Sequence, residues 1–248
     1  MIFAAACNYG FDTVKPFLKS LYATGYDGKV VMVVISPRNR IPEFFEGHHI
    51  EFIPLPSTSL PVHSARLIAF QQYLKNNPTD EQVIHTDVRD VIFQTNPATH
   101  LPSTGLHVYC EHEGMTIGKC PYNSKWIREG YGEEVLAELE ALPIICSGFT
   151  VGNGASMQVY FDTLIQEVSE HASVQGYEQG PHNGMVRRGV VQVTVHDNKG
   201  EVFTVGYVPK GSIRFEDGLV RNDFGVPCIV HQYDRHPNLK SAILGKYV

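Results

Sequence analysis

The first 35 residues constrain the fold more than any other stretch, because two almost wholly apolar runs enclose one helical segment. Residues 2–7 (IFAAAC) and 29–35 (KVVMVVI) are typical of strands covered on both faces, as in a parallel sheet. Residues 12–25 predict a helix with an apolar face, Pro16 in its first turn and Gly25 at its end. Strand, helix and strand at this spacing predict a βαβ unit and therefore an α/β fold.

Units of this kind bind ligands beyond the carboxyl ends of their strands. Asn8, Tyr9 and Ser36 follow the two predicted strands and are therefore candidates for ligand contacts. The sequence contains neither the G-x-G-x-x-G pattern of dinucleotide-binding folds nor the G-x-x-x-x-G-K-[ST] pattern of P-loops. These two classes of nucleotide site therefore lose their main support.

The composition favours one globular domain. The 248 residues are 43% hydrophobic and 19% charged, which suits a single sizeable core. The net charge of −6 argues against a general binder of nucleic acid or anionic membranes, since either needs a basic face. No apolar run is long enough to span a bilayer and the first ten residues do not resemble a signal peptide, so we expect a cytoplasmic protein. Five scattered cysteines without a C-x-x-C pair argue against a disulfide framework or a zinc site.

Residues 82–94 (QVIHTDVRDVIFQ) place charges between two short apolar runs that are predicted strands. Asp87, Arg89 and Asp90 lie where hydrophobic chain enters and leaves, and charges there are costly unless they are partnered. Two neighbouring carboxylates repel each other, so a divalent cation is a favourable partner; Mg²⁺ and Mn²⁺ prefer oxygen ligands and leave positions for substrate phosphates. In the alternative interpretation, Asp87 caps a turn and Asp90 pairs with Arg89 or another surface cation.

This stretch resembles the Asp-x-Asp element of glycosyltransferases of the GT-A fold, in a variant whose second aspartate falls three positions after the first. Three later elements follow in the family's order. Residues 143–153 (PIICSGFTVGN) resemble the strand that lines the donor sugar with an Asn/Ser-Gly pair. Residues 178–183 (EQGPHN) resemble the D-Q-x-x-x-N element, with glutamate in place of aspartate. Residues 228–237 (CIVHQYDRHP) resemble the segment whose histidine completes the metal coordination.

The resemblance implies a GT-A fold, in which helices flank a mixed and mainly parallel Rossmann-like sheet. It implies one domain over residues 1–248, with a nucleotide-binding half of about 1–110 and an acceptor and sugar half of about 111–248. It also implies Mn²⁺ or Mg²⁺ held by Asp87, Asp90 and His231, with Glu178 as the catalytic base or charge stabiliser. Contacts with a nucleoside-diphosphate-sugar donor are expected from Asn8, Tyr9, Ser36, Arg66, Ser147, Gly148, Gln179, Asn183 and Arg235.

Some features stay open at this point. Residues 190–196 and 201–208 alternate around Asp197-Asn198-Lys199-Gly200 and predict a small β-hairpin. Trp126 could offer a face to a sugar ring, although core packing explains it equally well, and residues 111–113 (EHE) are interpreted as a solvated loop. The acceptor hydroxyl could belong to a glycan, a lipid-linked glycan or a protein. A metal-dependent phosphohydrolase or nucleotidyltransferase and a non-catalytic sugar-nucleotide binding module remain alternatives.

Overall fold

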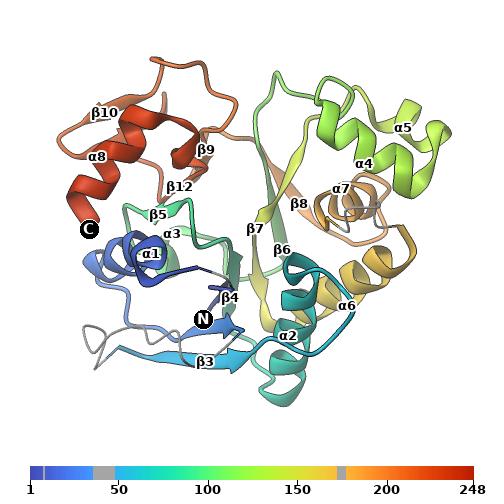
Figure 1. Ribbon diagram of the computed structural model, residues 1–248, viewed down its shortest axis with the longest axis horizontal. Coiled ribbons are helices and arrows are strands. Elements are labelled where there is room, and N and C mark those ends of the chain that lie inside the picture. Colours follow the sequence, from blue (N-terminus) through green and yellow to red (C-terminus); the bar gives the residue numbers. More distant parts are fainter. Residues whose placement is uncertain (8, 36–47, 172–176) are drawn as a thin grey trace.

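A seven-stranded sheet forms the centre of the computed structural model, which describes residues 1–7, 9–35, 48–171 and 177–248 (Figure 1). Its strand order is β3-β2-β1-β4-β7-β6-β8. β7 is antiparallel to both of its neighbours, whereas the other neighbouring pairs are parallel. The predicted α/β class with a mixed and mainly parallel sheet is therefore confirmed. The strands are β1 (Ile2–Ala5), β2 (Val30–Val34), β3 (Ile50–Pro54), β4 (Gln82–Thr86), β6 (Leu106–Cys110), β7 (Ile145–Asn153) and β8 (Thr194–His196).

Helices cover both faces of this sheet, which explains the continuous apolar runs of β1 and β2. Successive side chains of a strand point to opposite faces, so Phe3 packs toward α2 (Val62–Asn76) and α6 (Gly154–His171). Its neighbour Ile2 packs toward α1 (Phe11–Ala23), the helix that joins β1 to β2.

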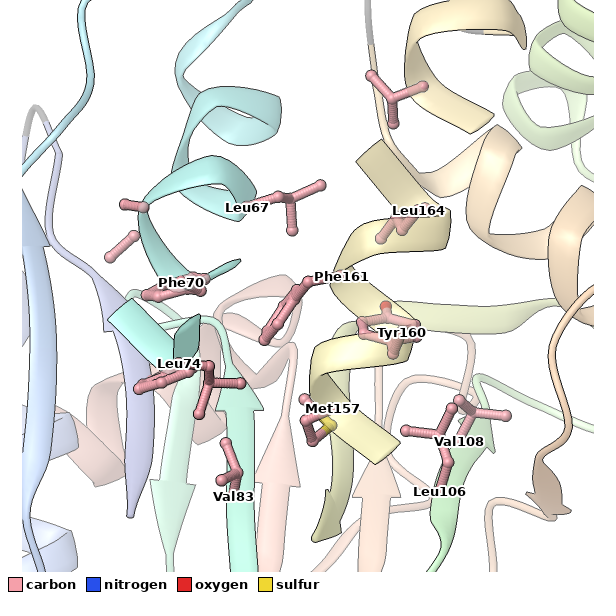
Figure 2. Packing of buried hydrophobic residues seen from close by; sticks show 14 of the residues in the cluster. Leu67, Phe70, Leu74, Val83, Leu106, Val108, Met157, Tyr160, Phe161 and Leu164 are labelled. Atoms are coloured by element: carbon pink, nitrogen blue, oxygen red, sulfur yellow. The ribbon is translucent and has the colours of Figure 1, made fainter. Parts of the chain in front are cut away.

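Aromatic rings fill the layer between the sheet and the helices α2 and α6 (Figure 2). Phe70 of α2 stacks on Phe3 at 5.0 Å between ring centroids and lies 5.8 Å from Phe161 of α6. His85 of β4 lies against the same rings, 5.4 Å from Phe70 and 5.6 Å from Phe161. Burial lowers the pKa of His85 to about 3, so its imidazole is neutral at physiological pH.

In a second, three-stranded sheet, a strand near the end of the chain pairs with a strand from the first half of the chain. β12 (Ile229–His231) pairs antiparallel with β5 (Val91–Phe93) and parallel with β9 (Val202–Thr204). The apolar residues of this sheet pack against α8 (Pro237–Tyr247), the last helix. The central sheet and this smaller sheet therefore meet around the loop between β4 and β5, where the predicted metal residues lie.

The β-hairpin predicted at 190–208 is wrong. β8 joins β6 at the edge of the central sheet and β9 joins β12, so the two segments do not pair with each other. Asn198 holds the connection open, because its side chain accepts a hydrogen bond from the backbone N–H of Thr204 and donates one to the Thr204 carbonyl. A hairpin does form between β10 (Arg214–Glu216) and β11 (Leu219–Arg221) around Asp217-Gly218, which has positive φ at both residues.

The remaining helices are short: α4 (Pro121–Tyr131), α5 (Glu133–Leu139) and α7 (Gln179–Arg187) belong to the second half of the chain, and α3 (Pro97–His100) and the single-turn 3₁₀ helix η2 (Tyr233–Arg235) follow the strands β5 and β12 of the smaller sheet. Among the helices in the described ranges, none combines the length and apolar character required to cross a bilayer.

Candidate functional site

A cavity of about 330 Å³ opens beyond the carboxyl ends of β1 and β4. This is the edge of the sheet at which α/β folds bind ligands. Most of the residues predicted from sequence to contact the metal or the donor line this cavity. They are Tyr9, Arg66, Asp87, Asp90, Ser147, Gly148, Glu178, Gln179, His231 and Arg235.

Strand pairing brings the three predicted metal ligands together. Asp87 follows β4, and its backbone N–H donates to the carbonyl of Gly148 on β7 at 2.9 Å. The pairing of β5 with β12 sets His231 opposite Val91, the residue after Asp90. As a result, Nε2 of His231 lies 3.7 Å from Oδ2 of Asp87 and 3.7 Å from Oδ1 of Asp90. One ligand atom from each of the three residues lies within 4.8 Å of the others.

This group of residues fits a divalent cation. Two carboxylates and one imidazole are the donor types that suit Mn²⁺ or Mg²⁺. Gly148 leaves room for them, since a Cβ there would lie 2.8 Å from Cε1 of His231 and still closer to Oδ2 of Asp87. Cys146 places its sulfur 3.4 Å from Nδ1 of His231, so Nδ1 has a partner of its own while Nε2 faces the carboxylates.

The two aspartates have opposite electrostatic environments. Burial acts to raise the pKa of Asp87, but the positive charge of Arg66 and the attraction of the nearby His231 outweigh it and lower that pKa. Burial raises the pKa of Asp90, and the attraction of His231 does not offset it. Burial acts to lower the pKa of His231, yet its interactions with Cys146, Asp87 and Asp90 raise it well above the usual value. The three groups are therefore strongly coupled through one small volume.

Arg66 joins the metal residues to the predicted catalytic residue. Its Nη1 donates to Oδ1 of Asp87 at 2.6 Å, and its Nη2 donates to Oε1 of Glu178 at 2.8 Å. Nε donates to the carbonyl of His63 in the same helix, α2. Arg66 is only 8% exposed, and each of its three guanidinium nitrogens donates one hydrogen bond, two of them to carboxylates. The resemblance implies a donor contact for Arg66, and no pattern in the sequence predicts this bridge between two carboxylates.

Two residues of the E-Q-x-x-x-N element, Glu178 and Gln179, line the cavity, whereas Asn183 lies in the protein interior. Glu178 is 5% exposed and lines the cavity immediately before α7. Gln179 accepts from the backbone N–H of Ser147 at 2.8 Å and donates to Oε1 of Glu111 at 3.1 Å. Asn183 is fully buried and does not line the cavity; its amide bonds both backbone groups of Ile145. Asn183 thus fixes α7 against β7 in this structure.

Two of the other predicted donor contacts, Asn8 and Ser36, lie outside the described residues. Ser147 and Gly148 line the cavity, and β7 runs continuously through them.

Sequence analysis missed several residues of the cavity. Glu111, interpreted as part of a solvated loop, is 6% exposed and lines the cavity, where burial raises its pKa. It follows β6, which runs in the same direction as β4, so the rule that ligands lie at strand ends could have identified it. Three further rings, from His63, Tyr122 and Tyr177, line the cavity beside Trp126, for which the sequence left a sugar contact open. Tyr122 lies four residues before Trp126 on the same helix, whereas His63 and Tyr177 lie far from it in the sequence and give no local signal.

Comparison with known proteins assigns no family. No protein-family model matches the sequence, and no curated protein matches it. The chemistry of the site must therefore be argued from its own residues and their geometry.

Proposed function

We propose that this protein is a metal-dependent glycosyltransferase of the GT-A type, which moves a sugar from a nucleoside-diphosphate-sugar donor to a hydroxyl acceptor. The observation that carries the proposal is the convergence of Asp87, Asp90 and His231, within 4.8 Å, in a cavity at the carboxyl ends of parallel strands. Glu178 and Arg66 lie beside them, so a potential cation site and a potential proton acceptor share one small volume.

The chain offers groups for each part of a nucleotide-sugar donor. Asp87, Asp90 and His231 would hold Mn²⁺ or Mg²⁺, which when bound stabilises the negative charge that develops on the departing diphosphate. Arg89 and Arg235 also line the cavity and offer guanidinium groups to phosphate oxygens. Ser147 and the bare backbone at Gly148 would lie against the sugar, because a residue without Cβ allows close approach.

Glu178 is the proposed base or charge stabiliser. Arg66 fixes its Oε1, and its Oε2 lies 4.0 Å from Nε2 of His63. A carboxylate oriented in this way can accept the proton of an attacking hydroxyl or stabilise positive charge at the reacting sugar carbon. Because Arg66 also bonds Asp87, the proposed base and the proposed metal ligands keep a fixed spacing.

We assign this reaction to the cytoplasm. All five cysteines lie in the described ranges, and all are free and buried. Free thiols are typical of proteins from a reducing compartment.

The test is turnover of a panel of nucleotide sugars with and without Mn²⁺. The wild type should release an intact nucleoside diphosphate in a Mn²⁺-dependent reaction. Asp87→Ala and Asp90→Ala should each abolish that turnover while circular dichroism shows a folded protein, and Glu178→Gln should lose turnover but retain donor binding. Asp162→Asn, a change of a surface carboxylate on α6, is the matched control and should retain full activity.

Other products would contradict the proposal in specific ways. Release of phosphate or pyrophosphate would indicate a phosphohydrolase or a nucleotidyltransferase. Thermal stabilisation by a nucleotide sugar without any turnover would indicate a binding module. Full activity in both aspartate variants would remove the metal assignment.

A further inference from the structure

One wall of the cavity carries aromatic rings and an amide that the proposed chemistry does not use. Tyr122, Asn123 and Trp126 all lie in the first turns of α4 and all line the cavity. Tyr122 and Trp126 are four residues apart, so they share one side of the helix. Tyr122 is 65% exposed, which makes it one of the most exposed large apolar side chains among the described residues.

The rings continue as a row toward Glu178. The centroid of Tyr122 lies 6.1 Å from that of Trp126, which in turn lies 5.1 Å from Tyr177. Tyr177 stacks on His63 at 4.5 Å, and Nε2 of His63 is 4.0 Å from Oε2 of Glu178. A row of ring side chains therefore leads from the exposed Tyr122 to the proposed base.

Asn123 adds a buried hydrogen-bond acceptor to this wall. The residue is 4% exposed, and its Nδ2 donates to the sulfur of Cys120 at 3.3 Å. Its Oδ1 is buried and has no hydrogen-bond partner within the described residues. An unsatisfied buried carbonyl oxygen is costly, and Asn123 is among the residues that line the cavity, so a ligand O–H or N–H donor that reaches Oδ1 would satisfy it.

A pyranose ring offers a partner both for the aromatic rings and for the unsatisfied oxygen of this wall. Its C–H face is apolar and can cover an aromatic ring, while the hydroxyls around its edge donate hydrogen bonds. We propose that Tyr122, Trp126 and Asn123 form a subsite for the acceptor, and that the acceptor is a carbohydrate. This inference rests on the proposed function and deepens it, because that function leaves the class of acceptor open.

The position of the wall favours the acceptor over the donor. The nucleotide is expected beside the first βαβ unit, where Tyr9 lines the cavity. Most of the wall comes instead from α4 and from Tyr177, the residue before Glu178, in the other half of the chain, and α2 contributes His63. Its four ring side chains and Asn123 include no lysine or arginine, so the wall lacks the cations that would recognise a diphosphate.

The test uses the intrinsic fluorescence of Trp126, the only tryptophan of the chain, without donor or metal. The probes are methyl glycosides and disaccharides of glucose, galactose, mannose, N-acetylglucosamine, N-acetylgalactosamine, glucuronic acid and N-acetylneuraminic acid. At least one should change the emission saturably. Tyr122→Ala should weaken its binding about 10-fold, the upper range for one aromatic contact, whereas Tyr122→Phe should bind like the wild type. Phe224→Ala, which removes another exposed ring, one outside the cavity, is the control.

Asn123 is tested separately with monodeoxy derivatives of the sugar that binds. Loss of the hydroxyl that meets Oδ1 should weaken binding to the wild type and have no further effect on Asn123→Ala. Equal losses in both proteins would remove Asn123 from the subsite. No saturable emission change with any probe up to 100 mM, or unchanged binding to Tyr122→Ala, would overturn the subsite.

The two proposals fail in different ways. If nucleotide sugars are turned over with Mn²⁺ but no carbohydrate perturbs Trp126, only the acceptor subsite is lost. If a carbohydrate binds to Trp126 through Tyr122 but no nucleotide sugar is turned over, the glycosyltransferase assignment fails and the carbohydrate site stands without it.

Discussion

The floor of the cavity consists of Arg66, Asp87, Asp90, Glu178 and His231, and behind it lies the aromatic layer between the central sheet and the helices α2 and α6. Both regions bury ionisable groups, but they stabilise them in opposite ways. On the floor, Arg66 lies between Asp87 and Glu178, and His231 lies between Asp87 and Asp90, so charge is balanced by charge. In the layer behind, His85 and His182 are fully buried, and burial lowers the pKa of each to about 3. The floor therefore keeps its charges, whereas the layer excludes them. A charged group is retained only where the chain supplies a partner of opposite sign.

The largest effect should follow the removal of Arg66. Arg66→Met leaves the carboxylates of Asp87 and Glu178 without their counter-charge, and breaking a buried ion pair costs about 3–5 kcal/mol of unfolding free energy. Urea denaturation at pH 7 measures this loss.

Two further variants test the cause of that loss. Arg66→Lys keeps the charge but not the two-pronged geometry, so it should fall between the wild type and Arg66→Met. The triple variant Arg66→Met, Asp87→Asn, Glu178→Gln should recover part of the lost stability because it removes the unpaired carboxylates. A triple variant that is no more stable than Arg66→Met would show that packing, and not charge, makes Arg66 necessary.

The next largest effect should be a loss of Mn²⁺ affinity when the space that Gly148 leaves beside Asp87 and His231 is filled. Gly148→Ala inserts a methyl group against Asp87 and His231, so these side chains must move apart. We expect Mn²⁺ to bind about 10–100-fold more weakly, as when other supports of a metal ligand are lost. Thermal stabilisation of the protein as a function of Mn²⁺ concentration measures this change. Gly152→Ala, in the same strand but against the backbone of Gly105, is the control and should leave the Mn²⁺ affinity unchanged relative to its own stability.

How far the sequence predicts these two regions depends on whether the deciding interactions are local. The apolar runs predict β1 and β2 within a residue or two, because both faces of each strand are covered and every residue must be apolar. The three-residue strands β8 and β9 were given the wrong partners, since so short a strand takes its neighbour from whichever sheet edge is available. The helix predicted over residues 12–25 agrees with α1 within two residues at its end, although Pro16 lies inside the helix and not in its first turn.

The same distinction applies to the site. The residues at strand ends, Asp87 and His231, line the cavity as their positions predict. The bridge from Arg66 to Glu178 spans 112 positions of the chain, and no local pattern encodes it. Asn183 carries the expected side chain at the expected offset, yet its amide is used by the backbone of β7. A motif thus predicts where a residue lies better than it predicts what that residue contacts.

A smaller effect should appear in the aromatic layer, where the stability of the folded protein should depend on pH through His182. The pKa of His182 is about 3 in the folded protein and near 6.5 in the unfolded chain, so between these values only the unfolded state binds the proton. The stability that neutral His182 contributes is therefore present above pH 6.5 and is lost as the pH falls, by about 2 kcal/mol at pH 5. His182→Phe removes this dependence. Urea denaturation of both proteins at pH 7, 6 and 5 measures the difference, and parallel pH profiles would show that His182 is protonated in the folded state.

The smallest effect tests whether burial itself separates the floor from an ordinary surface pair. Lys75 and Asp162 lie 3.1 Å apart, a distance similar to those made by Arg66, but their side chains are 53% and 43% exposed. Water already solvates both charges, so Asp162→Asn should change the unfolding free energy by no more than about 0.5 kcal/mol. Urea denaturation at low and high salt checks this, with Lys75→Gln as the reciprocal variant. A loss comparable to that of Arg66→Met would mean that distance alone sets the strength of an ion pair here, and the contrast between paired charges on the floor and excluded charges behind it would lose its physical basis.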